Sequence, residues 1–171
     1  YPVYKKNYNR NKKYEPPVPP SPNLPNYKSI RLYPSLCFFE GTTVSVGRGT
    51  EKPFQIYGAP FLPKSKYDLE FTPQSNDGAQ YPKHQGQTCY GEAFNQLPKK
   101  VIDLEYLISA YCNKPKQVKF FNDFFNKLAG NKTLQNKIKR NWSVDKIYKS
   151  WSNGLDSFKK IRSQYIYYST N

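Results

Sequence analysis

The sequence contains no methionine, one histidine and three cysteines, and it has no long apolar run. Because not even the first residue is methionine, we interpret the chain as a processed or excised piece of a larger product. His84 and three cysteines without C-x-x-C spacing argue against a structural zinc site, and we expect no cofactor. A helix needs about 20 apolar residues to cross a membrane, so the sequence predicts no membrane span.

The three cysteines leave two interpretations open. Free, partly buried thiols are the simpler one, since unpaired cysteines often behave as small apolar residues. The alternative is a disulfide between Cys37 and Cys89, which an exported protein can form. Cys112 ends an amphipathic segment and precedes a polar NKPK turn, where nothing marks a partner, so we predict a free thiol at this position.

Acidic residues are scarce relative to basic ones. The chain has 27 lysines and arginines against 12 aspartates and glutamates, a net charge of +15. Residues 114–171 alone hold 13 basic and 3 acidic residues. Such a surface can attract a polyanion such as nucleic acid or anionic lipid, or it can be the solvated face of lysine-rich helices. The sequence has no RNA-binding motif or zinc-finger spacing, which argues against nucleic acid as the partner.

Proline is concentrated near the N-terminus. Six prolines lie between Pro16 and Pro25, and each fixes φ and removes a backbone donor. We therefore predict that residues 1–29 form an extended connector, without regular helix from Tyr1 to Asn26, and that residues 30–171 form a single domain. A proline-rich ligand for a small recognition domain is the alternative interpretation of the connector.

Residues 30–94 show short apolar patterns. A short helix is expected first, at YPSLCFFEG, with Pro34 in its first turn and Gly41 at its end. Alternating apolar residues then predict four strands, around residues 44–46, FQIYG, YDLEF and TCYGEAF. The polar segment QSNDGAQ predicts an exposed turn.

The C-terminal half has helical periodicity. Two apolar stripes have the spacing i, i+3, i+4 and i+7, namely Leu104, Leu107, Ile108 and Tyr111, and then Phe121, Phe124, Phe125 and Leu128 before Gly130. Ser143 has the position of an N-cap. A last stripe is expected to join the core through Phe158, Ile161 and Tyr165. Strands followed by helices predict the α+β class: a proline-rich arm, a small strand-rich region and a C-terminal group of amphipathic helices.

The stretch CFFEGTTVSVGRGTEKPF places a carboxylate, Glu40, close to a guanidinium, Arg48. Beside Phe38 and Phe39 the carboxylate can lose solvation, as catalytic carboxyl groups often do. Arginine offers a planar fork of donors, and glycines on both sides of it allow a ligand or another backbone to come close. The alternative is an internal ion pair between Glu40 and Arg48 that locks a loop.

Several segments, in order, resemble a known family. PPSPNLPN, YPSLCFFEGTTVSVGRGTEKPF, GAPFL and GQTCYG resemble the C-terminal domain of the bacterial exo-β-N-acetylmuramidases, formerly an uncharacterised conserved bacterial domain family. The later segments FFNKLAGN and SWSNGLDSFKKIRSQYIYY are similar to the terminal helices of that family. The resemblance covers nearly the whole chain.

This resemblance implies a secreted, two-domain glycoside hydrolase of cell-wall recycling. An N-terminal Rossmann-like domain would face this domain across the substrate cleft. The enzyme would release N-acetylmuramic acid from the non-reducing end of peptidoglycan fragments, in the periplasm or outside the cell. Glycoside hydrolysis needs two carboxyl roles, and the acid is expected from the other domain. Glu40 is therefore the catalytic candidate in this chain, which we expect to be inactive alone.

We expect a substrate-binding rim beside Glu40, made of Arg48, Thr42, Gly49, Thr50 and Tyr90. N-acetylmuramic acid carries a lactyl carboxylate, for which a guanidinium is a natural partner, and threonine hydroxyls suit sugar hydroxyls. Two other functions remain open. One is a non-enzymatic basic module that binds a polyanion or nucleic acid, and the other is a carbohydrate-binding domain that has lost catalysis.

Overall fold

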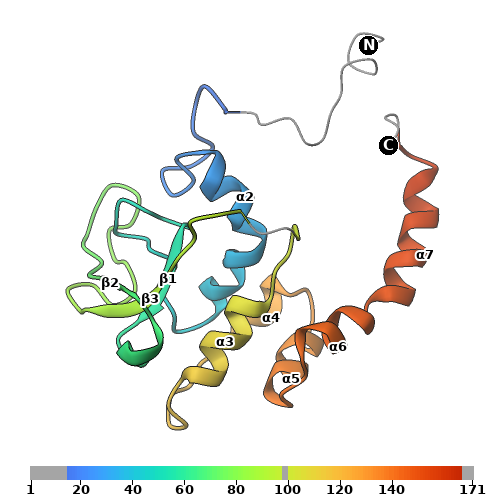
Figure 1. Ribbon diagram of the computed structural model, residues 1–171. Helices are drawn as coiled ribbons and strands as arrows, with labels where there is room; N and C mark the ends of the chain where they lie inside the picture. The colour runs from blue at the N-terminus through green and yellow to red at the C-terminus, as the bar shows by residue number, and fades with distance from the viewer. Residues whose placement is uncertain (1–14, 98–99, 167–171) are drawn as a thin grey trace.

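The computed structural model describes residues 15–97 and 100–166 (Figure 1). Three strands form one antiparallel sheet in the order β1-β3-β2. They are β1 (Ile56–Ala59), β2 (Leu69–Phe71) and β3 (Cys89–Ala93). In the register, Ile56 lies opposite Ala93 and Leu69 lies opposite Gly91. The strands predicted at FQIYG, YDLEF and TCYGEAF are confirmed.

The segment at residues 44–46 does not extend this sheet as a fourth strand. Ser45 exchanges two backbone hydrogen bonds with Gly58, of 2.8 and 3.0 Å, and the pairing is an isolated bridge. Immediately afterwards Gly47 (φ 75°) and Gly49 (φ 81°) turn the chain away, in a conformation that residues with a side chain rarely adopt. The predicted strand is therefore reduced to one bridge.

The first helix begins earlier than the sequence pattern suggests. Helix α2 spans Tyr27–Leu36 and continues as a 3-10 helix, η1, over Cys37–Gly41. A capping box sets its start: the Asn26 side chain accepts a hydrogen bond from the Ser29 backbone N–H (2.9 Å), and the Asn26 N–H donates to the Ser29 hydroxyl (3.3 Å). Pro34 thus lies inside α2, and its predicted place in a first helical turn is wrong.

The segment before α2 has no helix in its described part. Residues 15–25 form bends and an isolated bridge between Ser21 and Leu24. The first 14 residues of the predicted connector lie outside the described residues.

The C-terminal half of the described chain is helical, as predicted. Its helices are α3 (Glu105–Asn113), α4 (Phe125–Leu128), α5 (Thr133–Lys139), α6 (Val144–Lys149) and α7 (Ser152–Ser163), and a 3-10 turn, η2 (Lys64–Lys66), lies between β1 and β2. The Ser143 hydroxyl accepts a hydrogen bond from the Lys146 N–H (3.3 Å), which confirms the predicted N-cap of α6.

The helix predicted from Phe121 to Leu128 is a single turn. Phe121 pairs with Thr42 in an isolated bridge, and Asn122 donates its N–H to the Gly41 carbonyl (3.0 Å), so the chain stays extended there. The helix α4 begins only at Phe125, whose backbone packs where a side chain on Gly41 would stand. This pairing carries the segment past η1, and it explains why the helical pattern overestimates the helix.

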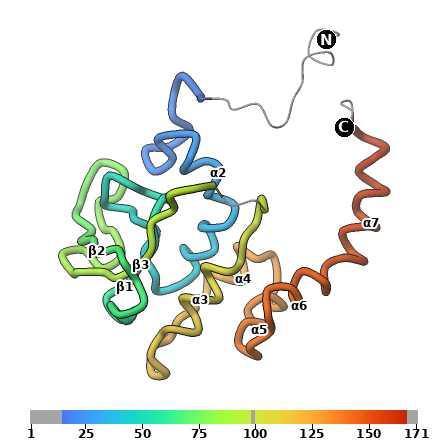
Figure 2. Tube along the Cα trace, viewed as in Figure 1, coloured from blue at the N-terminus to red at the C-terminus, as the bar shows by residue number. Residues whose placement is uncertain are grey.

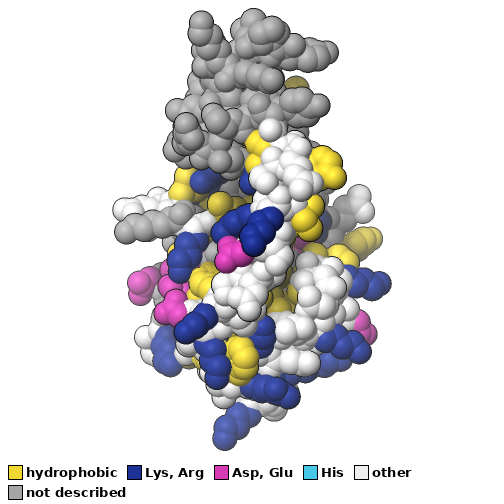
Figure 3. Space-filling model, turned by 90° about the vertical axis from the view of Figure 1, so that its right-hand side faces the viewer, with side chains coloured by type: hydrophobic (Ala, Val, Ile, Leu, Met, Phe, Trp, Pro, Cys, Tyr) yellow, Lys and Arg dark blue, Asp and Glu magenta, His cyan; other side chains and the backbone are white. Residues whose placement is uncertain are grey.

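The expected core position of the last apolar stripe is wrong. Helix α7 extends away from the rest of the molecule (Figures 1 and 2), and Phe158, Ile161 and Tyr165 are 59%, 57% and 74% exposed. Figure 3 views the molecule from this side and shows lysines and arginines scattered over it. The helix is amphipathic, but the described part of the chain does not cover its apolar stripe.

The core that positions the site is largely aromatic. The rings of Phe39 and Tyr57 stack at 4.9 Å, which joins η1 to β1, and those of Phe121 and Phe125 meet edge to face at 4.5 Å. Phe39, Tyr57 and Phe125 are fully buried. The 3-10 helix η1 is thus anchored in the core just before the loop that leads to Arg48.

Candidate site around Glu40 and Arg48

A cavity of about 610 Å³ opens beside the loop that follows η1. Three parts of the chain line it: Glu40, Ser45, Val46 and Arg48 from the loop, residues 77–83, and Phe124. Tyr81 and Phe124 are 91% and 48% exposed, so two aromatic side chains stand at this opening without burial in the core. The cavity thus combines charged groups with exposed rings.

Glu40 and Arg48 face each other in this cavity. Arg48 Nη1 lies 3.4 Å from Glu40 Oε1, and Arg48 Nη2 donates to the Gly78 carbonyl at 3.4 Å. The side chains of Arg48 and Glu40 are 42% and 25% exposed. Arg48 Nε is buried without a hydrogen-bond partner in the described chain. The pair is therefore accessible, and the guanidinium still has donors to offer.

The glycines around Arg48 serve the fold. A side chain on Gly47 would collide with Ile56, and one on Gly49 would collide with the Gln74 carbonyl and the Pro82 ring. The close approach predicted for these glycines is thus made by the chain's own neighbouring segments. The tight turn orients Arg48 towards the cavity.

Lys83, which the sequence pattern did not single out, holds the loop that carries Glu40. Its ammonium donates to four backbone carbonyls, those of Thr42 (2.6 Å), Phe39 (2.9 Å), Glu40 (3.2 Å) and Val44 (3.3 Å). Burial lowers the pKa of Lys83 to about 8, an effect that the Glu40 carboxylate opposes. The shape of the loop from η1 to Val44 depends on this contact.

Two further contacts fix the same loop. His84 Nε2 lies 2.6 Å from the Thr43 carbonyl oxygen, and the Asn122 side chain donates to the Glu40 carbonyl at 3.2 Å. His84 lies about 40 residues from Thr43 in the sequence, and Asn122 lies about 80 residues from Glu40. No local sequence pattern signals contacts over such distances, which explains why sequence reasoning missed Asn122 and, before it, Lys83.

Four of the predicted rim residues lie elsewhere. Thr42 is buried, and its hydroxyl donates to the Phe39 carbonyl (2.8 Å) and accepts from the Val44 N–H (3.1 Å). The Thr50 hydroxyl donates to the Gly47 carbonyl (2.7 Å). Gly49 is buried in the turn, and Tyr90 is half-buried on β3. The structure brings together Glu40 and Arg48, but it does not place these four on the cavity wall.

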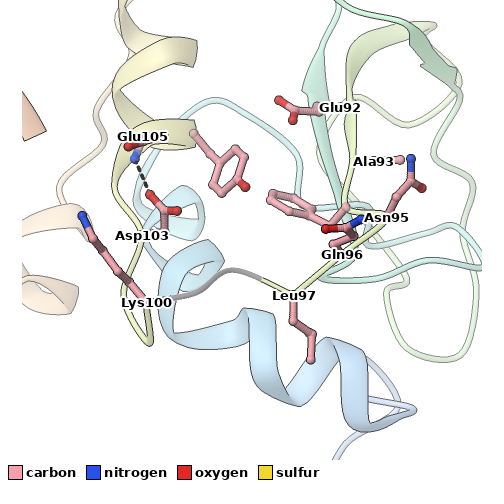
Figure 4. A pocket seen from close by; sticks show the side chains of 10 residues that line it. Glu92, Ala93, Asn95, Gln96, Leu97, Lys100, Asp103 and Glu105 are labelled. Atoms are coloured by element: carbon pink, nitrogen blue, oxygen red, sulfur yellow. Dashed lines mark hydrogen bonds between the residues drawn. The ribbon is translucent and has the colours of Figure 1, made fainter.

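A second cavity, of about 500 Å³, lies between the end of β3 and the start of α3 (Figure 4). Glu92 and Asp103 face it from different walls. The buried Tyr57 hydroxyl donates to Glu92 (3.0 Å), and burial together with this carboxylate raises the pKa of Tyr57. Asp103 accepts from the Glu105 N–H at the start of α3 (3.0 Å). Both carboxylates thus hold neighbouring segments of the chain, whereas the cavity at Arg48 contains a guanidinium with unused donors and is the stronger candidate.

The remaining predictions about residue chemistry concern metals and cysteines. Among the described residues, no three histidine, cysteine, aspartate or glutamate side chains converge as a metal site. Cys37, Cys89 and Cys112 are all free thiols, half-buried, buried and exposed respectively. Within the described ranges, no helix has the length and apolar character needed to cross a membrane.

Comparison with known proteins connects this geometry to a family. Residues 31–168 match the family model described as exo-beta-N-acetylmuramidase NamZ, C-terminal. The peptidoglycan beta-N-acetylmuramidase NamZ of Bacillus subtilis is 32% identical over 90% of this chain and 41% of its own length.

Two crystal structures of DUF1343 family proteins from Bacteroides fragilis have a similar fold. One is 43% identical, with a TM-score of 0.88 over 97% of this chain and 48% of its own. The other, 15% identical, has a TM-score of 0.62 over 89% of this chain and 45% of its own, and shows the fold alone. The chain thus spans less than half the length of each of these relatives.

Proposed function

Since the chain belongs to the family described as exo-beta-N-acetylmuramidase NamZ, C-terminal, we propose that it forms one wall of the substrate cleft of an exo-acting glycoside hydrolase. The enzyme releases terminal N-acetylmuramic acid from peptidoglycan fragments during cell-wall turnover and recycling. The match over residues 31–168 is the observation that carries this proposal. A cell-wall substrate also supports a periplasmic or extracellular location.

The partner in this proposal is an N-terminal Rossmann-like domain of the same protein. The Bacillus subtilis relative, named a peptidoglycan beta-N-acetylmuramidase, is more than twice as long as the part that this chain covers. The surfaces of this chain that such a domain would cover are the open rim at Arg48 and the exposed apolar stripe of α7. We expect the chain to be inactive without it.

The role of Glu40 follows from its partner. In the ion pair with Arg48 it is a carboxylate, which suits a base or a charge-stabilising group and not the acid that protonates a leaving group. Hydrolysis of a glycosidic bond needs both roles. The acid therefore comes from the partner domain, and Glu40 is the candidate for the second carboxyl role.

Arg48 is the candidate for recognising the sugar. A guanidinium has five N–H donors, and the described contacts of Arg48 use two of its nitrogens. The lactyl carboxylate of N-acetylmuramic acid matches the remaining donors on the terminal nitrogens. Tyr81 and Phe124 at the opening offer apolar ring surface for the faces of a sugar.

Titration of the isotope-labelled chain with N-acetylmuramic acid, followed by NMR, tests this assignment. We expect amide shifts to cluster at residues 45–48 and 77–83, with weaker shifts from N-acetylglucosamine, which lacks the lactyl group. Equal responses to both sugars, or shifts scattered away from the cavity, would contradict the assignment. The alternative basic module predicts instead a response to many polyanions that disappears steeply with added salt.

A further inference from the structure

A third cavity, of about 480 Å³, lies between the chain that follows α3 and the helix α5. Four lysines line it. Lys114 and Lys119 come from the segment after α3, and Lys132 and Lys139 flank or end α5. The lining contains one carboxylate in the described chain, Asp123. None of the ion pairs found among the described residues involves these four lysines.

The spacing of residues along α5 explains why Lys132 and Lys139 point the same way, whereas Lys137 binds the Ser150 hydroxyl (2.6 Å) elsewhere. Lys132, Gln135 and Lys139 have the spacing i, i+3 and i+7, which places them on one helix face. Leu134 and Ile138 lie on the other face and are buried in the core. Burial of the apolar face thus fixes the direction of the face that carries Lys132 and Lys139.

The floor of the cavity is aromatic. The rings of Tyr111 and Phe121 lie 5.4 Å apart, and each has an ammonium near it: Lys114 Nζ is 5.3 Å from the Tyr111 ring and Lys139 Nζ is 5.9 Å from the Phe121 ring. Tyr111 is only half-buried. The cations are held close to ring surfaces, so the cavity presents apolar area and positive charge side by side.

Amide groups complete the lining. The Asn126 side-chain N–H donates to Gln135 Oε1 (3.1 Å), whereas Asn126 Oδ1 is buried without a partner in the described chain. A buried acceptor without a donor is costly, and a ligand with a hydroxyl or amide N–H would satisfy it.

We propose that this cavity is a second binding site, for an acidic saccharide that carries carboxylate groups. The ammonium groups of Lys114, Lys119, Lys132 and Lys139 bind the carboxylates, the Tyr111 ring packs against a sugar face, and Asn126 accepts from a sugar hydroxyl or amide. The site is distinct from the cavity at Arg48 and does not depend on the proposed enzymatic function. In this proposal, part of the positive charge of the C-terminal half binds a specific ligand.

One hydrogen bond connects the linings of the two cavities. Asn122 lines the lysine cavity, and its side chain donates to the Glu40 carbonyl on the other side (3.2 Å). The acidic saccharide in the lysine cavity can come from two sources: it can be the far end of a saccharide bound in the Arg48 cavity, or a separate acidic glycan. Both offer the same carboxylate chemistry. The variant Arg48→Ala distinguishes the two sources, because it weakens only a ligand that also occupies the Arg48 cavity.

Calorimetric titration with trigalacturonic acid, a carboxylated trisaccharide, tests the proposal at about 150 mM salt, where diffuse surface attraction is screened. The double variant Lys119→Glu/Lys132→Glu should weaken binding by at least about tenfold. Its matched control, Lys149→Glu/Lys160→Glu, makes the same change in net charge on α6 and α7 and should leave binding within about twofold.

Comparison probes decide whether a saccharide is recognised. Neutral chitotriose lacks the negative charge of trigalacturonic acid. Triglutamate has the carboxylates without the sugar rings, and inorganic phosphate has neither the carboxylates nor the sugar rings. We expect each to bind more weakly than trigalacturonic acid. Equal binding of triglutamate or phosphate would reduce the site to a non-specific anion patch, and an equal loss in both double variants would show diffuse charge alone. Either result, or no binding of trigalacturonic acid, would overturn the proposal.

Discussion

At the residue scale, one lysine organises the candidate site. Lys83 lines the same cavity as Arg48, and its ammonium is held by four carbonyls of the loop that carries Glu40. A charged donor within a cage of carbonyls stabilises that cage, because Lys83 is the donor found in the described chain for the Thr42 and Val44 carbonyls. The loop therefore depends on a residue about 40 positions further along the chain.

Substitution of Lys83 measures this dependence. Lys83→Met keeps the length of the side chain and removes its donors, so it should lower the free energy of unfolding by about 2–4 kcal/mol. Lys116 is exposed, and Lys116→Met should change the free energy of unfolding by less than about 0.5 kcal/mol. Urea denaturation compares the two variants. Equal stability of the Lys83 and Lys116 variants would mean that the carbonyl contacts contribute nothing.

The cysteines give a second residue-scale prediction. Burial raises the pKa of Cys89 to about 12, and burial together with Glu40 raises the pKa of Cys37 to about 11, so at pH 8 both stay protonated in the folded chain. Cys112 is exposed. Because the thiolate is the reactive form, brief alkylation at pH 8 should modify Cys112 first.

Mass spectrometry of the native and the urea-unfolded chain reads this out. The native chain should carry one adduct, at Cys112, and the unfolded chain three. Rapid labelling of Cys89 in the native chain, or the absence of a Cys37 adduct after unfolding without reductant, would contradict the free, buried thiols of the structure.

At the scale of elements, patterns within a segment predicted its type better than its limits. The alternating segments became β1, β2 and β3, and Ser143 caps α6. The start of α2 was missed although its signal is local, an Asn26–Ser29 box. The start of α4 was predicted too early for a different reason, since Phe121 and Asn122 are held by the distant η1 segment, and such pairing overrides helical periodicity.

Helix α7 shows what amphipathic spacing does not tell. A stripe at i, i+3 and i+7 predicts an apolar face, but it does not say whether that face is covered by the same domain. Phe158 is 59% exposed, whereas Ile147 in the neighbouring α6 is fully buried. Substitutions of these two residues therefore compare an exposed apolar face with a buried one.

We expect Phe158→Ser to change the free energy of unfolding of this chain by less than about 0.5 kcal/mol. Ile147→Ala should cost about 2–5 kcal/mol, because it leaves a cavity in the core. Urea denaturation of both variants measures the difference. A cost for Phe158→Ser comparable to that for Ile147→Ala would mean that α7 packs against the body of the domain.

At the scale of the whole molecule, the sequence predicted the fold class and the central pair of the candidate site. The α+β class followed from strand patterns that precede helical patterns. The pair Glu40 and Arg48 followed from one stretch of residues that contains both. The rest of the cavity lining, with Lys83, Tyr81 and Phe124, was not predicted, because it comes from two segments far from Arg48 in the sequence. Thr42 and Thr50 have hydroxyls suited to a sugar, but the loop uses both for its own backbone.

The central claim is that the cavity at Arg48 recognises the muramic acid carboxylate in a two-domain hydrolase. The most direct measurement is the steady-state hydrolysis of a chromogenic N-acetylmuramide by the full-length protein and its Arg48→Ala variant, beside the matching N-acetylglucosaminide as substrate or competitive inhibitor. We predict turnover of the muramide, a KM raised about tenfold or more by Arg48→Ala, and a change of less than about twofold for the glucosaminide. No turnover of any muramyl substrate, or an equal loss for both sugars, would contradict it.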